Sequence, residues 1–265
     1  MTVDSVVARL RAAGCVFAEE EAEILRASAE TPASLDAMVA RRAAGEPLEQ
    51  VVGWAEFCGR RIFVDPEVFV PRRRSEFLVS VALELAGARA AAERLVIVDL
   101  CCGTGALGLA VAAGVGASEL YAADLDPAAV ACARRNVEPA GGQVYEGDLF
   151  DALPSGLRGR IDVLICNAPY VPTTEISFMP AEAREHEALM ALDGGADGLA
   201  ILRRVTASAD EWLAPGGVLL VETSERQAPS MAAAISAAGL AARIHSDDES
   251  GATVVTGVRP LQSVR

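Results

Sequence analysis

Five short strand-like runs alternate with helical segments between residues 95 and 223, and this alternation constrains the fold more than any other feature. The runs are LVIVDL (95–100), ELYAAD (119–124), QVYEGD (143–148), IDVLICN (161–167) and GVLLVET (217–223). Strands joined by helical crossovers form right-handed βαβ units, in which helices cover both faces of a parallel sheet. We therefore expect an α/β fold with a mostly parallel sheet.

The last part of the chain breaks this alternation. The stretches AARIH and ATVVTGV are separated only by SDDESG, which is too short for a crossover helix. Strands joined by so short a connection pair antiparallel. We expect the last strand of the sheet to run against the others.

The N-terminal part of the chain has a different pattern. Residues 3–44 have helical spacing, with Pro32 near a helix start. Residues 56–70 read as a β-hairpin connector, in which Asp65 and Pro66 offer a turn. A helix is expected near 75–87, and the Ala-rich stretch 88–93 is expected to be a surface linker. We expect a helical domain with its hairpin over residues 1–75 and an α/β domain over residues 76–265.

Composition and charge limit the kinds of partner and the cellular compartment that we expect. The formal net charge is −14, and a phosphate backbone would be repelled by it, so no nucleic-acid partner is expected. No secretion signal or membrane-length apolar run is present, which predicts a cytoplasmic protein without a membrane partner. The six cysteines lack C-x-x-C spacing, so we expect them to be reduced. With only two histidines, the sequence does not indicate a metal site.

Ligands of open α/β sheets bind outside the carboxyl ends of the strands, and four such ends are polar here. The first, VDLCCGTGALG (98–108), is a weak match to the dinucleotide pattern G-x-G-x-x-G. We expect Asp99, at the strand end before the glycines, to be ionised, and its negative charge suits the ammonium or sulfonium region of S-adenosylmethionine better than a pyrophosphate. Since no hydride-transfer motif follows, S-adenosylmethionine is favoured over NAD.

Two further strand ends carry acidic residues. Asp124, about 20 residues beyond the glycines, is placed to accept both ribose hydroxyls, whereas Asp126 before Pro127 has the pattern of a helix N-cap. After the third strand, Asp148 can accept from the adenine amino group, and Leu149 or Phe150 can cover the ring.

The fourth strand end, CNAPY (166–170), suggests a clamp for a planar NH2 group. An amide nitrogen is a poor nucleophile, so positioning and electrostatics must supply most of the catalysis. The side-chain oxygen of Asn167 and the carbonyl of Ala168 can each accept one N–H. Pro169 disfavours a helical conformation at Ala168, and Tyr170 offers an apolar face.

With these motifs the chain resembles the HemK/PrmC family, protein-(glutamine-N5) methyltransferases that act on peptide chain release factors. The family belongs to the Rossmann-like class I methyltransferases. The resemblance covers nearly the whole chain. It includes EPL (46–48), GWAEFCG (53–59), VDPEVFVPR (64–72), the Gly loop, NAPY (167–170) and ALDGGADGL (191–199).

The resemblance implies a cofactor, a substrate and site residues. The cofactor is S-adenosyl-L-methionine, and the partner is a protein with an exposed glutamine, such as a release factor, which the N-terminal domain helps to dock. The catalytic residues are Asn167, Ala168, Pro169 and Tyr170. The expected cofactor-binding residues are Asp99, Cys101, Cys102, Gly103, Thr104, Gly105, Asp124, Asp148, Leu149 and Asn167, where Asp99 and Asp148 rest on the strand-end argument.

Several positions depart from the family pattern. Ala168 replaces the first proline of NPPY, and Cys101 stands where glycine is usual. PRRRSE (71–76) replaces PRPxTE, and REHEA (184–188) replaces a segment that usually ends in EP. These changes cluster near the expected substrate side and indicate a paralogue, which leaves the acceptor open.

Alternative functions and roles therefore remain. The acceptor can be a small-molecule amide or amine. A DNA adenine methyltransferase would use a similar clamp, but the acidic charge opposes it. A catalytically silent cofactor-binding module and a NAD-dependent oxidoreductase are further alternatives. We expect Arg72–Arg74 to form a solvated or Glu-paired face, and family analogy puts Glu182 and Glu187 at the substrate entrance.

Overall fold

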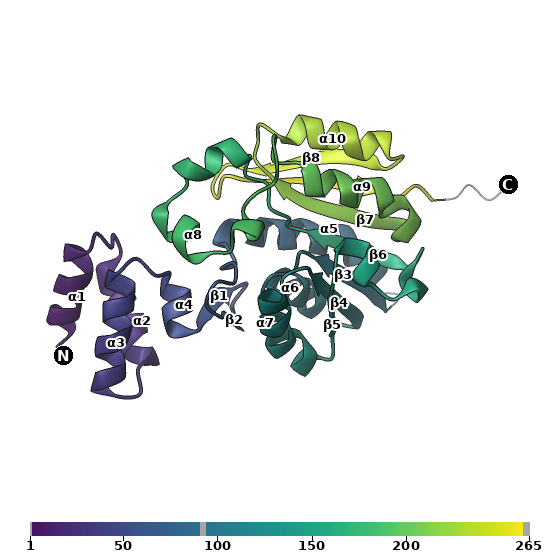
Figure 1. Ribbon diagram of the computed structural model, residues 1–265. Coiled ribbons are helices and arrows are strands. Elements are labelled where there is room, and N and C mark those ends of the chain that lie inside the picture. Colours follow the sequence, from purple (N-terminus) through teal and green to yellow (C-terminus); the bar gives the residue numbers. More distant parts are fainter. Residues whose placement is uncertain (1, 91–93, 262–265) are drawn as a thin grey trace.

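The computed structural model describes residues 2–90 and 94–261, and a seven-stranded sheet lies at the centre of this part (Figure 1). The strand order is β5-β4-β3-β6-β7-β9-β8. The strands are β3 (Leu95–Leu100), β4 (Ser118–Asp124), β5 (Gln143–Glu146), β6 (Ile161–Cys166), β7 (Leu213–Thr223), β8 (Ala241–Asp247) and β9 (Ala252–Val258). Only β9 is antiparallel to its neighbours, β7 and β8. The predicted fold class is confirmed.

The strand order places a crevice between β3 and β6. From β3 the chain builds β4 and β5 on one side and then returns to place β6 on the other side. Such a switch point is where open α/β sheets bind ligands, outside the carboxyl ends of the strands. The polar strand ends found in the sequence therefore meet at one edge.

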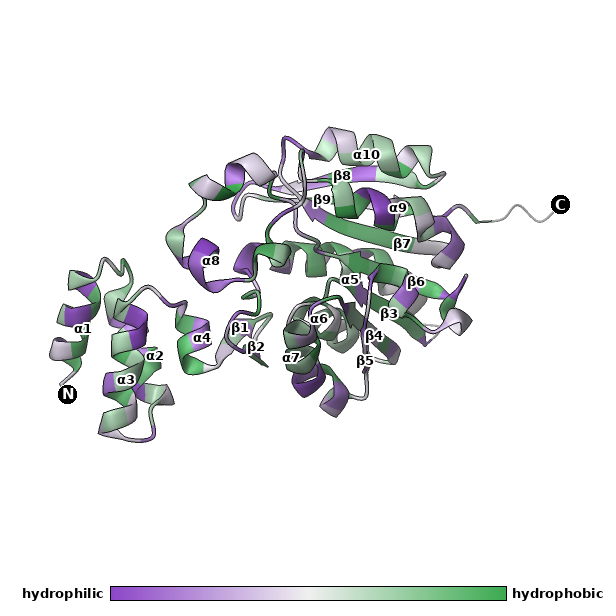
Figure 2. Cartoon of the chain, viewed as in Figure 1, coloured by the Kyte–Doolittle hydropathy of each residue, from purple (hydrophilic) through white to green (hydrophobic). Residues whose placement is uncertain are grey.

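Helices cover both faces of the sheet. One face carries α5 (Glu76–Ala90), α6 (Ala106–Val115) and α7 (Pro127–Val137), and the other carries α9 (Ala200–Trp212) and α10 (Ala228–Ala237). Every residue of β3 and β6 is buried, which explains why these strands are apolar without alternation. Figure 2 shows these central strands as hydrophobic.

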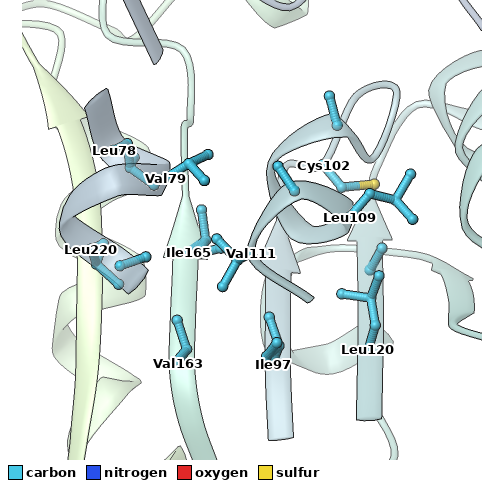
Figure 3. Packing of buried hydrophobic residues seen from close by; sticks show 14 of the residues in the cluster. Leu78, Val79, Ile97, Cys102, Leu109, Val111, Leu120, Val163, Ile165 and Leu220 are labelled. Carbon is cyan, nitrogen blue, oxygen red and sulfur yellow. The ribbon is translucent and has the colours of Figure 1, made fainter. Parts of the chain in front are cut away.

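Interlocking aliphatic side chains hold α5 and α6 on the sheet (Figure 3). Val111 of α6 and Ile97 of β3 are completely buried, as are Leu78 of α5 and Leu220 of β7. Burying one such side chain contributes roughly 1.5–3 kcal/mol. This packing fixes the carboxyl ends of the central strands on which the crevice depends.

The N-terminal helices have a hydrophobic cluster of their own, built on residues such as Val6, Leu25 and Val39. The helices are α1 (Val3–Ala12), α2 (Ala18–Ser28), α3 (Pro32–Ala43) and α4 (Leu48–Val52). Pro32 is the first residue of α3, as predicted, and Thr31 with Ser34 forms a capping box before it. Figure 1 shows these helices at one end of the molecule.

A two-stranded hairpin, β1 (Trp54–Phe57) and β2 (Arg60–Phe63), follows α4. The hairpin reverses at Cys58 and Gly59, which both have positive φ, 49° and 67°. Such a pair is typical of tight hairpin turns, whose twist matches that of the strands. The predicted turn at Asp65 does form, since Val68 N–H donates to the Asp65 carbonyl at 3.3 Å, but it lies beyond the hairpin.

A long connection between β6 and α9 crosses to the N-terminal helices. It contains the 3-10 helices η5 (Thr173–Phe178) and η6 (Leu189–Ala191) and the helix α8 (Ala181–His186). The buried Gln50 of α4 donates 3.1 Å hydrogen bonds to the carbonyls of Val68 and His186, so three segments meet there. The remaining 3-10 helices are η1 (Arg73–Ser75), η2 (Glu138–Ala140), η3 (Leu149–Ala152) and η4 (Ser155–Leu157).

Helix α5 continues to Ala90, into the stretch expected to be a linker, and residues 91–93 of that stretch lie outside the described residues. Among the helices described over 2–90 and 94–261, none combines the length and the apolarity that a bilayer crossing needs.

Candidate active site

A cavity of about 200 Å³ lies at the carboxyl ends of β3, β4, β5 and β6. Eleven of the residues predicted for the site line it together. They are Cys101, Cys102, Gly103, Thr104, Asp124, Asp148, Leu149, Asn167, Ala168, Pro169 and Tyr170. Asp99 and Gly105, which were also predicted, are not among the lining residues. The polar strand ends thus form one wall of a single cavity.

The loop after β3 is tied to the end of β4. Asp124 accepts a hydrogen bond from the Gly103 N–H at 2.8 Å through one carboxylate oxygen and from the Asp126 N–H at 3.0 Å through the other. A carboxylate has about four acceptor positions, so Asp124 can still accept from a ligand hydroxyl. Burial raises the pKa of Asp124 above its ordinary value, although the backbone N–H groups act in the opposite direction. Asp126 caps α7, as predicted, by accepting from the Ala128 N–H.

Cys101 occupies a conformation that is costly for a side chain. Its φ is +54°, in the left-handed region, which explains why a glycine suits this position. Non-glycine residues held there cost about 1–3 kcal/mol and cluster at functional sites. The hydrogen bond with the adjacent thiol of Cys166, together with burial, raises the pKa of Cys101, so its thiol stays protonated and is a poor nucleophile.

Asp99 lies completely buried behind the Gly loop. One carboxylate oxygen accepts from the Gly108 N–H at 2.8 Å, and the other, Oδ1, has no partner among the described residues. Burial raises the pKa of Asp99 to about 8. The raised pKa favours the neutral acid, which differs from the ionised group expected from the sequence.

The end of β5 supplies an apolar surface and an ion pair. Leu149 lines the cavity with φ +50°, whereas Phe150 stacks on Trp212 away from it at 5.2 Å between ring centroids. Leu149 is thus the side chain placed to cover a ring. Asp148 also reaches the cavity wall, where the Arg204 guanidinium donates to it at 2.7 Å.

Asn167 presents its two polar atoms to different surroundings. Its Nδ2 atom lies 3.4 Å from Ser75 Oγ and 3.5 Å from a carboxylate oxygen of Glu222. Its Oδ1 atom and the carbonyl of Ala168 accept no hydrogen bond from the residues described here. Two neighbouring acceptors are therefore available at the cavity, which is the arrangement predicted for a clamp.

Tyr170 is tied to side chains that the sequence interpretation did not include. Its hydroxyl donates to Glu222 at 3.0 Å and accepts from Arg74 at 2.7 Å, and the Arg74 guanidinium carbon lies 6.0 Å above the ring centroid. Burial raises the pKa of Tyr170, so the phenol stays protonated. Arg74 thus lies over one face of the ring.

Glu222, Ser75 and Arg74 are therefore the site residues that sequence reasoning missed. Glu222 could have been found, because it lies at the carboxyl end of the predicted strand GVLLVET, where the rule that identified the other strand ends also applies. Ser75 and Arg74 stand 92 and 96 residues before their partners Asn167 and Tyr170, and no local signal relates them.

The loop 192–199 braces the clamp from behind. A Cβ atom at Gly194 would lie 2.7 Å from the Pro169 carbonyl oxygen, and one at Gly198 would lie 2.2 Å from that of Tyr170. Gln227 donates to the carbonyls of Tyr170 and Asp197 at 2.8 and 2.9 Å. The glycines of ALDGGADGL thus permit a backbone contact that fixes the path of NAPY.

Two residues of the arginine triplet, Arg72 and Arg74, are paired with glutamates, whereas Arg73 is exposed. Arg72 donates from one nitrogen to both oxygens of Glu187 at 2.6 and 2.7 Å, and Arg74 contacts Glu222 at 3.3 Å. Glu187 is buried and does not line the cavity, which corrects its expected place at the entrance. Glu182 is partly exposed and lies 3.6 Å from Arg42 of α3.

The residues present fit S-adenosylmethionine. Asp124 offers acceptors for a ribose, and Leu149 offers an apolar surface. Among the described residues, no group of three or more His, Cys, Asp or Glu side chains is arranged to hold a metal ion.

Comparisons with known proteins agree with this geometry. Residues 75–197 match the family model described as a methyltransferase small domain. A release factor glutamine methyltransferase of Geobacter sulfurreducens is 37% identical over 84% of this chain and 76% of its own length. A 4-amino-L-phenylalanine/4-methylamino-L-phenylalanine methyltransferase of Streptomyces pristinaespiralis is 37% identical over 76% of this chain and 69% of its own length.

A solved structure shows the same fold. A methyltransferase from Pyrococcus furiosus superposes with a TM-score of 0.55 at 15% identity, over 77% of this chain and 90% of that one. Identity of 37% over most of the chain, together with the strand order and the cavity, identifies the family. The chain belongs to the S-adenosylmethionine-dependent methyltransferase family of the release factor glutamine methyltransferases.

Proposed function

We propose that this enzyme methylates the side-chain amide nitrogen of a glutamine in a protein, and that the protein is a peptide chain release factor. The observation that carries the proposal is the orientation of Asn167, whose Nδ2 faces Ser75 and Glu222 while Oδ1 keeps its lone pairs beside the carbonyl of Ala168. Paired acceptors suit an NH2 group. The names of relatives such as the Geobacter protein support the choice of acceptor.

The residues of the clamp account for the chemistry. When bound, S-adenosylmethionine supplies an electrophilic methyl group. Asn167 Oδ1 and the Ala168 carbonyl each accept one N–H of the acceptor, which aims the nitrogen and stabilises the positive charge that develops on it. The proton leaves after methyl transfer, so no strong general base is needed.

The N-terminal helices are proposed to help dock the protein acceptor. Residues 1–75, with four helices and the hairpin, are proposed as the recognition domain, and residues 76–265 as the methyltransferase domain. Gln50 of α4 donates to the carbonyl of Val68, after the hairpin, and to that of His186, in α8. These contacts support a rigid attachment of the N-terminal helices to the rest of the protein. A recognition domain held this way can present an acceptor loop in a fixed orientation.

A second candidate is N-methylation of a small aromatic amine that carries a carboxylate. The relative from Streptomyces pristinaespiralis is named for such a substrate, and Arg74 at the cavity wall, with 49% of its side chain exposed, is placed to meet an anionic group. The replacement of the first proline of the clamp by Ala168 removes a constraint on the loop, which suits a different acceptor.

Incubation with methyl-labelled cofactor distinguishes the two candidates. We expect label on the glutamine of the Gly-Gly-Gln loop of the cognate release factors after peptide mapping. Label on 4-amino-L-phenylalanine, with none on the release factors, would support the amine instead. Label on neither, with S-adenosylhomocysteine still bound, would contradict both.

Removal of the clamp side chain tests the mechanism separately. Asn167→Ala should lower kcat by roughly 10²–10³-fold, because one of two charge-stabilising groups is lost. The dissociation constant of S-adenosylhomocysteine, measured by calorimetry, should change much less. Equal losses in both quantities would mean that Asn167 serves cofactor binding rather than the clamp.

A further inference from the structure

A buried carboxylate lies beside the clamp without a part in the chemistry described above. Glu222, next to the last residue of β7, is 2% exposed. Its Oε1 atom accepts from the Tyr170 hydroxyl at 3.0 Å and from Arg74 Nε at 3.3 Å, and its Oε2 atom faces Asn167 Nδ2 at 3.5 Å. Two donors therefore hold one oxygen in place and leave the other directed at the clamp.

This contact decides which way the amide of Asn167 points. The oxygen and the NH2 group of an Asn side chain have nearly the same shape, so hydrogen-bond partners select the orientation. A carboxylate can only accept, and the alternative orientation would bring the Asn oxygen against it. The Ser75 hydroxyl accepts from Nδ2 as well but can also donate, so it does not by itself discriminate.

We infer that Glu222 is a positioning residue that orients the amide of Asn167 so that its oxygen faces the acceptor nitrogen, and that Tyr170 and Arg74 hold Glu222 for this task. The inference rests on the proposed function. With the amide reversed, the NH2 group of Asn167 would face the NH2 group of the acceptor, and two donors cannot form the clamp. Orientation, rather than charge at the reacting atoms, is the contribution of Glu222.

Glu222→Gln tests the inference with little change of shape. The new side-chain oxygen can still accept from Tyr170 and Arg74, but its NH2 group then faces Asn167 and favours the reversed amide. We expect kcat to fall roughly 10- to 100-fold, as for a misplaced catalytic contact. The dissociation constant of S-adenosylhomocysteine should stay within about twofold, because Glu222 does not line the cavity.

Thr223→Val is the matched control. Thr223 is the next residue of β7 and is buried, and its hydroxyl has no partner among the described residues. Val has nearly the same shape as Thr. The variant therefore tests whether a substitution next to Glu222 lowers activity without affecting the contact with Asn167. We expect turnover within about twofold of the unsubstituted enzyme.

A double-mutant cycle separates positioning from a general structural effect. If Glu222 acts through Asn167, Glu222→Gln should cost nothing more in an Asn167→Ala background. An equal loss with and without Asn167 would overturn the inference. The cycle uses whichever acceptor the unsubstituted enzyme methylates.

A spectroscopic test needs no acceptor and so remains decisive if the proposed function fails. In the full chain, the side-chain NH2 protons of Asn167, assigned by their loss in Asn167→Ala, should show nuclear Overhauser effects to Ser75 and Glu222. Those effects should vanish in Glu222→Gln. Their absence in the unsubstituted protein would refute the inference, whereas their presence with no methylated release factor would count only against the proposed acceptor.

Discussion

At the residue scale, three carboxyl groups in and beside the site differ in their surroundings. Asp124 accepts from two backbone N–H groups and reaches the cavity, Glu222 accepts from three side chains, and Asp99 is buried with one oxygen unpartnered. A carboxylate without enough donors is favoured in its neutral form. We therefore propose three different roles for these acids: a ligand acceptor, an orienting group and a buried group that can lose its proton.

The raised pKa of Asp99 predicts how stability depends on pH in the cofactor-free protein. Its pKa lies near 8 in the folded state and near 3.8 in the unfolded state, so the folded protein holds the proton more tightly. Its stabilising contribution is complete below the unfolded value and is lost as pH rises through the folded value. Between pH 5 and 7 the loss approaches about 1.4 kcal/mol per pH unit.

Asp99→Asn isolates this contribution, because the amide resembles the protonated acid in shape and does not titrate. Urea unfolding of both proteins from pH 5 to 8 should show the unsubstituted protein losing stability relative to the variant. Parallel curves would mean that Asp99 is ionised in the folded state. Asp124, which also raises the pKa of Asp99, is unchanged in both proteins.

At the element scale, the sequence predicts strands better than it predicts turns and partners. The run LVIVDL coincides with β3, and IDVLICN extends only one residue beyond β6, because a strand buried on both faces must be apolar throughout. The hairpin turn at Cys58 was missed because a non-glycine residue with positive φ gives no sequence signal. Neither could the sequence place Glu222 against Asn167, since they belong to different elements 55 residues apart.

The brace behind the clamp gives a prediction at the same scale. Gly198→Ala places a Cβ 2.2 Å from both the Tyr170 carbonyl oxygen and Gln227 Nε2 at φ +77°, so the NAPY loop must move. We expect a loss of about 1–3 kcal/mol in the free energy of unfolding and a fall in kcat of roughly 10²-fold.

Gly251→Ala is the control for backbone strain alone. Gly251 also has positive φ, +66°, but a Cβ there would meet nothing within 4 Å. It should lower the free energy of unfolding by about 1 kcal/mol without affecting kcat. Similar kinetics for the two variants would show that the contact with Tyr170 does not matter for catalysis.

At the scale of the whole molecule, the N-terminal helices, the segment after the hairpin and the connection between β6 and α9 meet at one junction. Gln50 bonds to Val68 and His186, Arg42 approaches Glu182, and Arg72 pairs with Glu187. Glu187 also accepts from the Val70 N–H at 3.1 Å. The cavity wall that carries Arg74 and Ser75 follows directly along the chain, so the junction positions part of the site.

Removing Arg72 tests how much the junction contributes. The Glu187 side chain is fully buried, and Arg72→Ala leaves the Glu187 carboxylate without a counter-ion, which should cost about 2–4 kcal/mol of the free energy of unfolding. Arg72→Met with Glu187→Met removes both charges and should cost less, because no uncompensated charge remains. Chemical unfolding of the three proteins gives this comparison.

The pH dependence of the destabilisation by Arg72→Ala identifies its cause. Burial already raises the pKa of Glu187 in the folded protein, and the Arg72 guanidinium counteracts this shift. Without Arg72 the folded-state pKa must rise further above the unfolded value. The destabilisation by Arg72→Ala should therefore be smallest near pH 5, where Glu187 can bind a proton, and should grow as pH rises through the new folded-state pKa. If the loss in the free energy of unfolding stayed constant from pH 5 to 8, its cause would be the lost packing of the arginine stem. An unpaired carboxylate at Glu187 would then not explain it.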